Sequence, residues 1–214
     1  MRKASLGILL MAVLLVCLTP VAMADTVFQL TVDNCTGGCN PGAPGTSMGT
    51  ITLHDNGNGS VLVTVALVSP LEFVNTGLQE TIDFNLTGIS SGVSASGFSN
   101  ANFSLTSGTA GSNHFDGLGN FAYAIQLNTA QGAGGAQPSP LSFTILAAGL
   151  TAGSFGANAN GFVFGVDVYN PTRGTTGPIG TSGGTPTVPE PSSMALLGTG
   201  LMGVAGAIRK RFRK

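Results

Sequence analysis

The segment Ile51-Thr-Leu-His-Asp-Asn-Gly-Asn-Gly-Ser-Val-Leu-Val-Thr-Val-Ala-Leu-Val68 predicts a β-hairpin. Its two apolar stretches, 51–54 and 60–68, flank the turn sequence 55–59, which contains two Asn-Gly pairs. Asn-Gly is typical of tight hairpin turns, because both residues tolerate positive φ angles. Within the second stretch, residues 61–68 are apolar on both faces apart from Thr64, which indicates a central strand. An antiparallel all-β domain is therefore expected around this hairpin.

Alternation of apolar and polar residues extends on both sides of the hairpin and predicts further strands. The alternating apolar residues are Phe28, Leu30 and Val32; Ile82, Phe84 and Leu86; Phe103 and Leu105; Phe121, Tyr123, Ile125 and Leu127; Leu141, Phe143 and Ile145; and Phe162, Phe164, Val166 and Val168. Gly, Asn and Ser separate these stretches, and no helical periodicity lies between them. Residues 25–171 are therefore predicted to form a single antiparallel β-sandwich, of jelly-roll or Ig-like type.

The acidic residues of these strands do not predict a catalytic site. Asp83 and Asp167 lie in the middle of strands, on the side opposite the apolar residues, and are expected to face solvent. Glycoside hydrolysis needs two carboxylates across a cleft, and the spacing of the acids selects no such pair. The Gly45-Thr-Ser-Met-Gly49 match to a nucleophile elbow leads into a strand rather than a helix. No catalytic residue is named, and the chain is not expected to be an enzyme.

Residues 1–24 have the three parts of a secretory signal peptide. Two basic residues follow the initiator methionine, and 6–18 are almost entirely apolar. The small residues Ala22 and Ala24 form the expected cleavage site before Asp25. The secretion machinery is therefore a predicted partner, and the domain is expected outside the cytoplasm.

The C-terminal part of the chain is divided into a linker and a tail. Residues 172–188 are dominated by Gly, Thr, Ser and Pro and are predicted to form a linker without a core of its own. Residues 189–214 form the tail, in which 192–208 carry no charge. As a helix this run spans roughly 25 Å, close to the ~30 Å hydrocarbon core of a bilayer. It is predicted to cross the inner membrane, with the basic end in the cytoplasm.

The tail resembles the PEP-CTERM sorting signal of Gram-negative bacteria. The residues that carry the resemblance are Pro189, Glu190 and Pro191, then Gly198, Gly200 and Gly203, then Arg209, Lys210 and Arg211. The resemblance implies recognition by an exosortase-type enzyme and processing near the Pro-Glu-Pro tripeptide. It also implies a transient inner-membrane anchor, followed by delivery to the cell surface or to the exopolysaccharide matrix of a biofilm. It implies no activity for residues 25–188.

Residues 25–188 carry little positive charge. Arg173 is their one basic side chain against eight acidic ones, which gives a net charge of −7. The acids are Asp25, Asp33, Asp55, Glu72, Glu80, Asp83, Asp116 and Asp167. Such a domain lacks the basic surface that attracts nucleic acid, so a nucleic-acid partner is excluded.

Cys35 and Cys39 are predicted to form a disulfide, because they are the only cysteines left after signal cleavage and the compartment is oxidising. No cofactor is expected, apart from a weak possibility of calcium. Asp33, Asp55 and Asp116 lie in or beside predicted loops and are the calcium candidates, although no calcium-loop spacing surrounds them.

Three functions are compatible with this sequence. The first is a non-enzymatic exported component of the cell surface or the exopolysaccharide matrix. The alternative is a carbohydrate- or calcium-binding adhesin module, and the third is a secreted hydrolase. A β-sandwich can carry all three, so the fold class does not distinguish them.

Overall fold

The computed structural model describes residues 24–77, 80–107 and 113–181, and four positions of the tail. The chain divides into two units, one of which is Asp25–Pro189 and the other Met1–Ala24 with Glu190–Lys214. The predicted signal peptide up to residue 23 and most of the predicted sorting tail lie outside the described residues. The four described tail positions, Gly198, Gly200, Leu201 and Gly203, are helical. Within the described residues there is no helix of the length and hydrophobicity that a membrane crossing requires.

The unit that begins at Asp25 is built from strands, as predicted. Its described strands are β1 (Thr26–Asp33), β2 (Gly49–Gly57), β3 (Ser60–Leu67), β4 (Glu72–Phe73), β5 (Ile82–Leu86), β6 (Ser94–Ser96), β7 (Phe103–Ser107), β8 (Asn113–Phe115), β9 (Gly119–Phe121), β10 (Tyr123–Leu127), β11 (Leu141–Leu146), β12 (Phe155–Gly156), β13 (Phe164–Asn170) and β14 (Thr175–Thr181). Two short 3-10 helices, η1 (Ala133–Gly135) and η2 (Ala152–Ser154), lie in the connections. The all-β class is confirmed.

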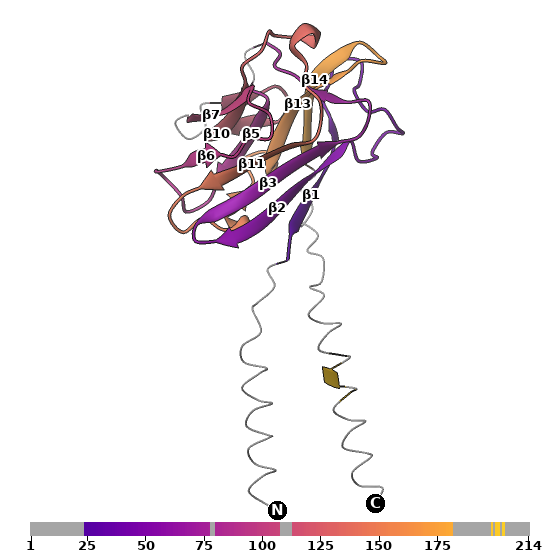
Figure 1. The fold of residues 1–214 in the computed structure, drawn as a ribbon. Coiled ribbons are helices and arrows are strands. Elements are labelled where there is room, and N and C mark those ends of the chain that lie inside the picture. Colours follow the sequence, from indigo (N-terminus) through magenta and orange to yellow (C-terminus); the bar gives the residue numbers. More distant parts are fainter. Residues whose placement is uncertain are drawn as a thin grey trace, which may run out of the picture. The chain divides into compact units, whose positions relative to one another are not determined.

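Twelve of the strands form one antiparallel sheet that curves nearly into a barrel (Figure 1). Its order is β6-β11-β3-β2-β1-β14-β13-β5-β10-β7, with β4 beside β13 and β12 beside β5. Strand β1 joins the two halves, because residues 26–29 pair with β2 and residues 30–33 pair with β14. The register shifts between Leu30 and Val32, where the strand passes from one partner to the other. The jelly-roll or Ig-like sandwich stays a prediction, since the two halves are one continuous sheet.

The hairpin predicted from the 51–68 segment is confirmed. Strands β2 and β3 pair along their length, and β3 lies between β2 and β11 as a central strand. Their two-residue connection is Asn58-Gly59, with φ angles of 56° and 74°. Positive φ at both positions is what a type I′ turn needs, and it explains the Asn-Gly sequence.

The main core fills the inner face of the curved sheet with the alternating apolar residues. It includes Phe28, Ile51, Val63, Phe84 and Phe164, all of which are buried. Ring contacts join the two halves of the sheet, since the Phe28 and Phe164 centroids are 5.5 Å apart in an edge-to-face arrangement. Aromatic pairs of this geometry add to the stability that burial alone provides.

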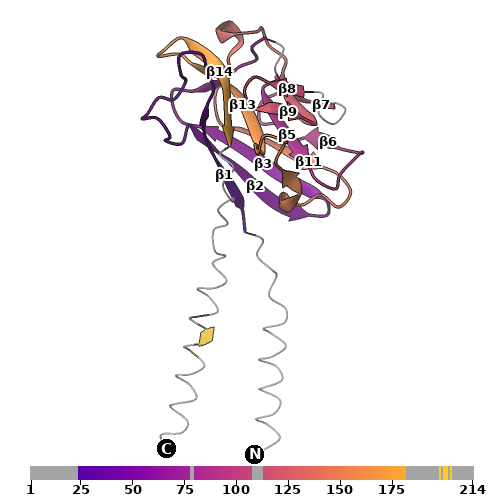
Figure 2. The ribbon, with the colours of Figure 1, turned by 180° about the vertical axis from the view of Figure 1, so that it is seen from behind.

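A second, smaller core lies on the opposite face of the sheet. The β8–β9 hairpin, labelled in Figure 2, contributes Phe115, Leu118 and Phe121, and these pack with Val32 and Phe162. The predicted single face of Phe121, Tyr123, Ile125 and Leu127 is therefore wrong for Phe121. The strand breaks at Ala122, so Phe121 belongs to the second core and the other three to the main one. Phe162 lies before the start of β13 rather than within the predicted strand, and its side chain packs against the same second core.

The predicted boundary between domain and linker at residue 172 is wrong. Residues 175–181 form β14, which pairs with β1 on one side and β13 on the other. The glycines of β14 are needed for close packing against neighbouring segments rather than for flexibility. A Cβ added at Gly177 would lie 2.7 Å from the Cα of Cys35, and one at Gly180 would lie 2.9 Å from the Cδ2 of Leu118. The domain therefore extends at least to Thr181, while linker residues 182–188 lie outside the described residues.

The variant Gly177→Ala tests this assignment. Its Cβ would overlap the backbone of Cys35, so we expect a loss of about 1–3 kcal/mol of stability, measured by chemical denaturation. Gly134→Ala is the matched control, because Gly134 has open space around it and no positive φ. Equal stability of the two variants would contradict a packed β14.

Candidate functional site

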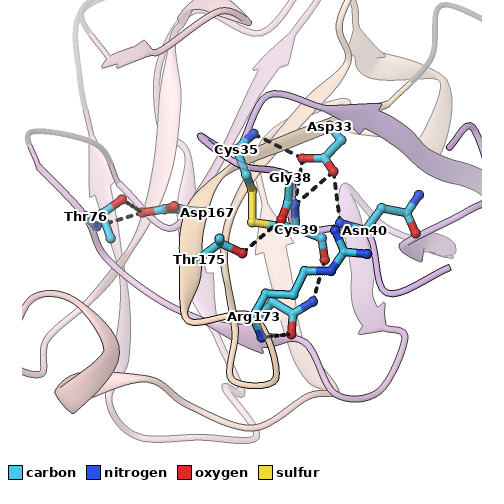
Figure 3. Close-up of a disulfide and its surroundings, with 10 residues drawn as sticks. Asp33, Cys35, Gly38, Cys39, Asn40, Thr76, Asp167, Arg173 and Thr175 are labelled. Carbon is cyan, nitrogen blue, oxygen red and sulfur yellow. Dashed lines mark hydrogen bonds between the residues drawn. A yellow bond between two sulfur atoms is a disulfide. The ribbon is translucent and has the colours of Figure 1, made fainter. Parts of the chain in front are cut away.

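The predicted disulfide between Cys35 and Cys39 is confirmed, and it closes a short loop directly after β1. Asp33, the last residue of β1, fixes this loop (Figure 3). Its carboxylate accepts hydrogen bonds from the backbone N–H groups of Cys35, Cys39 and Asn40, at 3.1, 2.9 and 2.9 Å. Charge-assisted bonds of this kind are among the stronger ones in proteins. The loop conformation therefore depends on Asp33 as well as on the disulfide.

The disulfide loop is also attached to the end of the β13–β14 hairpin. Asn170 donates its side-chain N–H to the carbonyl of Cys39 at 2.8 Å, and the Thr175 hydroxyl donates to the carbonyl of Gly38 at 2.9 Å. These bonds join segments more than 130 residues apart in sequence. The loop is therefore fixed to the connecting end of the β13–β14 hairpin.

A surface depression of about 390 Å³ lies beside the disulfide loop. Thr31, Asp33, Gly38, Asn40, Gly42, Pro44, Gly45 and Arg173 line it. Arg173 is the one Lys or Arg in residues 25–188, and it therefore places the positive charge of this part of the chain at the depression. Hydroxyl and guanidinium groups of this kind suit a polar ligand, whereas the Asp33 carboxylate already serves backbone donors and the Asn40 amide is hydrogen-bonded within its own loop.

The structure does not bring the three calcium candidates together. Asp33 serves the disulfide loop, and Asp55 accepts the N–H groups of Gly57 and Ala152 at 2.8 and 3.1 Å. Asp116 lies in the β8–β9 turn, 3.5 Å from the Nε2 atom of His114. Among the described residues, one group of three possible metal ligands has all its ligand atoms within 4.8 Å of one another, and it is Asp33, Cys35 and Cys39. Its two sulfur atoms are used in the disulfide, so this group does not suit a metal ion.

Two other acids occupy an unexpected position. Asp83 on β5 and Asp167 on β13 were expected to face solvent, yet both side chains have an exposed fraction of 0%. The prediction of the face is right and the prediction of exposure is wrong, because the β8–β9 hairpin covers that face. A Cβ added at Gly165, the cross-strand neighbour of Asp83, would lie 2.9 Å from the Cδ1 of Phe115.

Burial makes these carboxyl groups hard to ionise. Burial raises the pKa of Asp83 to about 8, and the nearby charges of Glu80 and Asp167 act in the same direction. Burial also raises the pKa of Asp167 to about 7, although hydrogen bonds from Thr76 favour its charged form. Glu80 is half-buried beside them, and its pKa is raised by burial as well. Two acids with raised pKa values, Asp83 and Asp167, therefore share one face of the sheet, and the charge of Glu80 acts on Asp83.

The polar face of β5 and β13 is a site that the sequence reasoning missed. Alternation places Asp83 and Asp167 on the face away from the main core, but it does not say what covers that face. A signal was present in Gly165 and Gly180, because glycines inside a strand often mark the close approach of another segment.

The predicted processing sites fall mostly outside the described residues. Of the signal-cleavage residues, Ala24 and Asp25 are described, and Ala22 is not. The Asp25 carboxylate pairs with the Nδ1 atom of His54 at 2.7 Å, on an exposed part of β2. In the sorting signal, Gly198, Gly200 and Gly203 are described as helical, whereas Pro189 to Pro191 and the basic cluster Arg209 to Arg211 are not described.

Comparison with known families matches the tail. The family model for the PEP-CTERM protein-sorting motif matches residues 187–211. The chain therefore carries a PEP-CTERM sorting motif, which supports an exported protein targeted to an exosortase. No significant match was found among curated proteins or among solved structures.

The role of Asp33 in the disulfide loop can be tested with Asp33→Ala. This variant leaves three backbone N–H groups without their acceptor, so we expect a loss of about 1–3 kcal/mol while the disulfide remains intact. Glu72→Ala, which also removes one carboxylate from a strand, should change stability much less. Unfolding by denaturant measures the difference, and an equal effect of the two variants would contradict the role of Asp33.

The raised pKa values of Asp83 and Asp167 predict that the stability of the folded protein depends on pH. The measurement is made in a chelator, so that no metal ion affects it. The folded-state pKa values of the two aspartates, about 8 and about 7, lie above the ordinary value of 3.8, so the folded protein binds more protons than the unfolded chain between these limits. Stability should therefore fall as the pH rises from 4 to 8. Asp83→Asn should reduce this fall and raise the melting temperature at pH 8, whereas Glu72→Gln should do neither. A wild-type melting temperature that rises over this range would contradict the assignment.

Proposed function

We propose that this chain is an exported, exosortase-processed protein that acts without catalysis at the cell surface or in the exopolysaccharide matrix. The observation that carries the proposal is the PEP-CTERM motif at residues 187–211. Such a tail targets the protein to its location, whereas any activity at that location has to come from the domain that precedes the tail.

The proposed route follows from the two ends of the chain. The N-terminal segment 1–24 directs the chain to the secretion machinery. The apolar run 192–208 then holds it in the inner membrane until the exosortase acts near Pro189-Glu190-Pro191. Processing releases the β domain from its anchor and delivers it to the surface or matrix.

The burial of the paired acids supports a non-catalytic role. A glycosidase needs two carboxylates that contact the substrate and water across a cleft. Asp83 and Asp167 are instead enclosed between the sheet and the β8–β9 hairpin, where no substrate reaches them. Asp33 and Asp55 bind backbone N–H groups, which leaves them poorly placed to transfer protons.

The alternative function is a carbohydrate-binding adhesin module. The observation that favours it is the polar depression beside the disulfide loop, where Thr31 and Arg173 offer hydroxyl and guanidinium groups. Sugar hydroxyls are recognised by such groups, and a matrix exopolysaccharide is the ligand that this reading suggests. Replacement of Arg173 by Ala would then weaken retention of the protein by the matrix.

The processing step has a direct test in the exporting host. The mature protein should lack Arg209 to Lys214, and intact mass spectrometry of surface or matrix fractions measures this. Replacement of Pro189, Glu190 and Pro191 by alanine should leave the tail attached and the protein in the membrane fraction. Replacement of Pro186 by alanine is the control, because it changes a proline just outside the matched residues. Surface-exposed wild-type protein that still ends at Lys214 would refute the proposal.

A further inference from the structure

Five side-chain oxygen atoms around the buried acids are enclosed and have no hydrogen-bond partner among the described residues. They are Glu80 Oε2, Thr81 Oγ1, Asp83 Oδ1, Asp83 Oδ2 and Asp167 Oδ1. Buried polar atoms are almost always paired in folded proteins, so a group of five such oxygens needs an explanation. Thr81 is informative because it carries no charge and is nonetheless buried with an unused hydroxyl.

Strand pairing places four of these oxygens, those of Thr81, Asp83 and Asp167, on one face. Thr81 and Asp83 are two residues apart in extended chain, and their neighbour Ile82 points into the main core, so both side chains point away from it. Asp167 lies beside them on β13, where its N–H donates to the carbonyl of Thr81 at 2.8 Å. Its second oxygen, Oδ2, is taken by the N–H and hydroxyl of Thr76, at 2.7 and 2.6 Å. The free Oδ1 of Asp167 therefore shares this face with Thr81 and Asp83.

Residues 25–188 supply no Lys or Arg beside these acids. Arg173, the one Lys or Arg of residues 25–188, lies at the depression beside the disulfide loop. The cover over the acids is partly apolar, since Phe115 and Leu118 lie closest to the strand at Gly165. It also contains Asn113 on β8, two residues before Phe115, whose side-chain N–H is buried without a partner among the described residues. An ionised carboxylate in such a place is strongly destabilising unless a counter-charge or a proton accompanies it. Either a bound proton or a cation from solution therefore has to accompany these carboxyl groups.

We propose that Glu80, Thr81, Asp83 and Asp167 form a binding site for one calcium ion beneath the β8–β9 hairpin. The donor set contains oxygen atoms alone, which is the preference of a hard cation. Calcium is favoured over magnesium because it accepts irregular geometry and a higher number of ligands. The proposal does not depend on the proposed route of export, and it involves none of the residues Asp33, Asp55 and Asp116 that the sequence suggested.

Glu80 would complete the site from its edge. The carboxylates of Glu80, Asp83 and Asp167 are not all within 4.8 Å of one another. Among the described residues, the one group of three possible ligands that meets this limit is the group at the disulfide loop. Asp83, Asp167 and Thr81 are fixed by the sheet, whereas Glu80 precedes β5 and is half-buried. Rotation of the Glu80 side chain toward the two aspartates would bring in the third negative charge.

The experiment is a set of thermal melts of the protein purified from the exporting cell. The solutions contain calcium chloride, a chelator, magnesium chloride, or sodium chloride at matched ionic strength. Calcium at about a hundred times its dissociation constant should raise the melting temperature by on the order of 5 °C or more relative to chelator. Sodium should not reproduce the rise, and magnesium should give a smaller one. Calorimetric titration with calcium should give one site per chain.

Variants locate the site. Asp83→Asn keeps the shape of the side chain and removes the buried charge, so this variant should fold in chelator and lose the calcium-dependent rise. Asp167→Asn should lose it as well, whereas the matched control Glu72→Gln should keep it. Equal melting temperatures of the wild type in calcium and chelator would overturn the proposal. It would also be overturned if Asp83→Asn and Asp167→Asn kept the full calcium-dependent rise, or if Asp33→Asn alone abolished it.

Discussion

Strand β1 is the element on which the rest of the domain depends, because its backbone pairs with two different partners. The N-terminal half bonds to β2 and the C-terminal half to β14, with the register shift between them. A shift of this kind bends a strand and strengthens its twist. The two halves of the sheet therefore close over a common core. Without β1 they would be two sheets with no continuous hydrogen-bonded ladder between them. The same strand ends at Asp33, so it also positions the disulfide loop.

The sheet half that contains β5 and β13 has two different faces. The inner face carries Phe84 and Phe164 and packs into the main core. The outer face carries Asp83 and Asp167, and the small core of β8–β9 covers it. Burial of Phe115, Leu118 and Phe121 favours this cover, while burial of the two carboxyl groups opposes it. The second of these terms, the burial of the carboxyl groups, is also the main cause of their raised pKa values.

The sequence was sufficient to predict the class of the fold and the strands with strict alternation. The 51–68 hairpin and the disulfide were also predictable, because their signals are local. Strand β14 was not, since Thr175 to Thr181 contains one large apolar side chain, Ile179, and its order comes from partners on both sides. The same limit applies to the buried acids. Alternation identifies the outer face of β5, but the cover of that face is formed by a hairpin thirty residues away in sequence.

The position of β14 has a mechanical consequence whenever the domain is pulled from its C-terminal side. The last described residue of the domain is Thr181, at the end of a strand that is hydrogen-bonded to β1 and β13. The hydrogen bonds of antiparallel strands run perpendicular to the strand direction. A force along the axis of β14 therefore loads both ladders in shear, so that many bonds bear the force at once. An edge strand in that position would instead peel away one bond at a time.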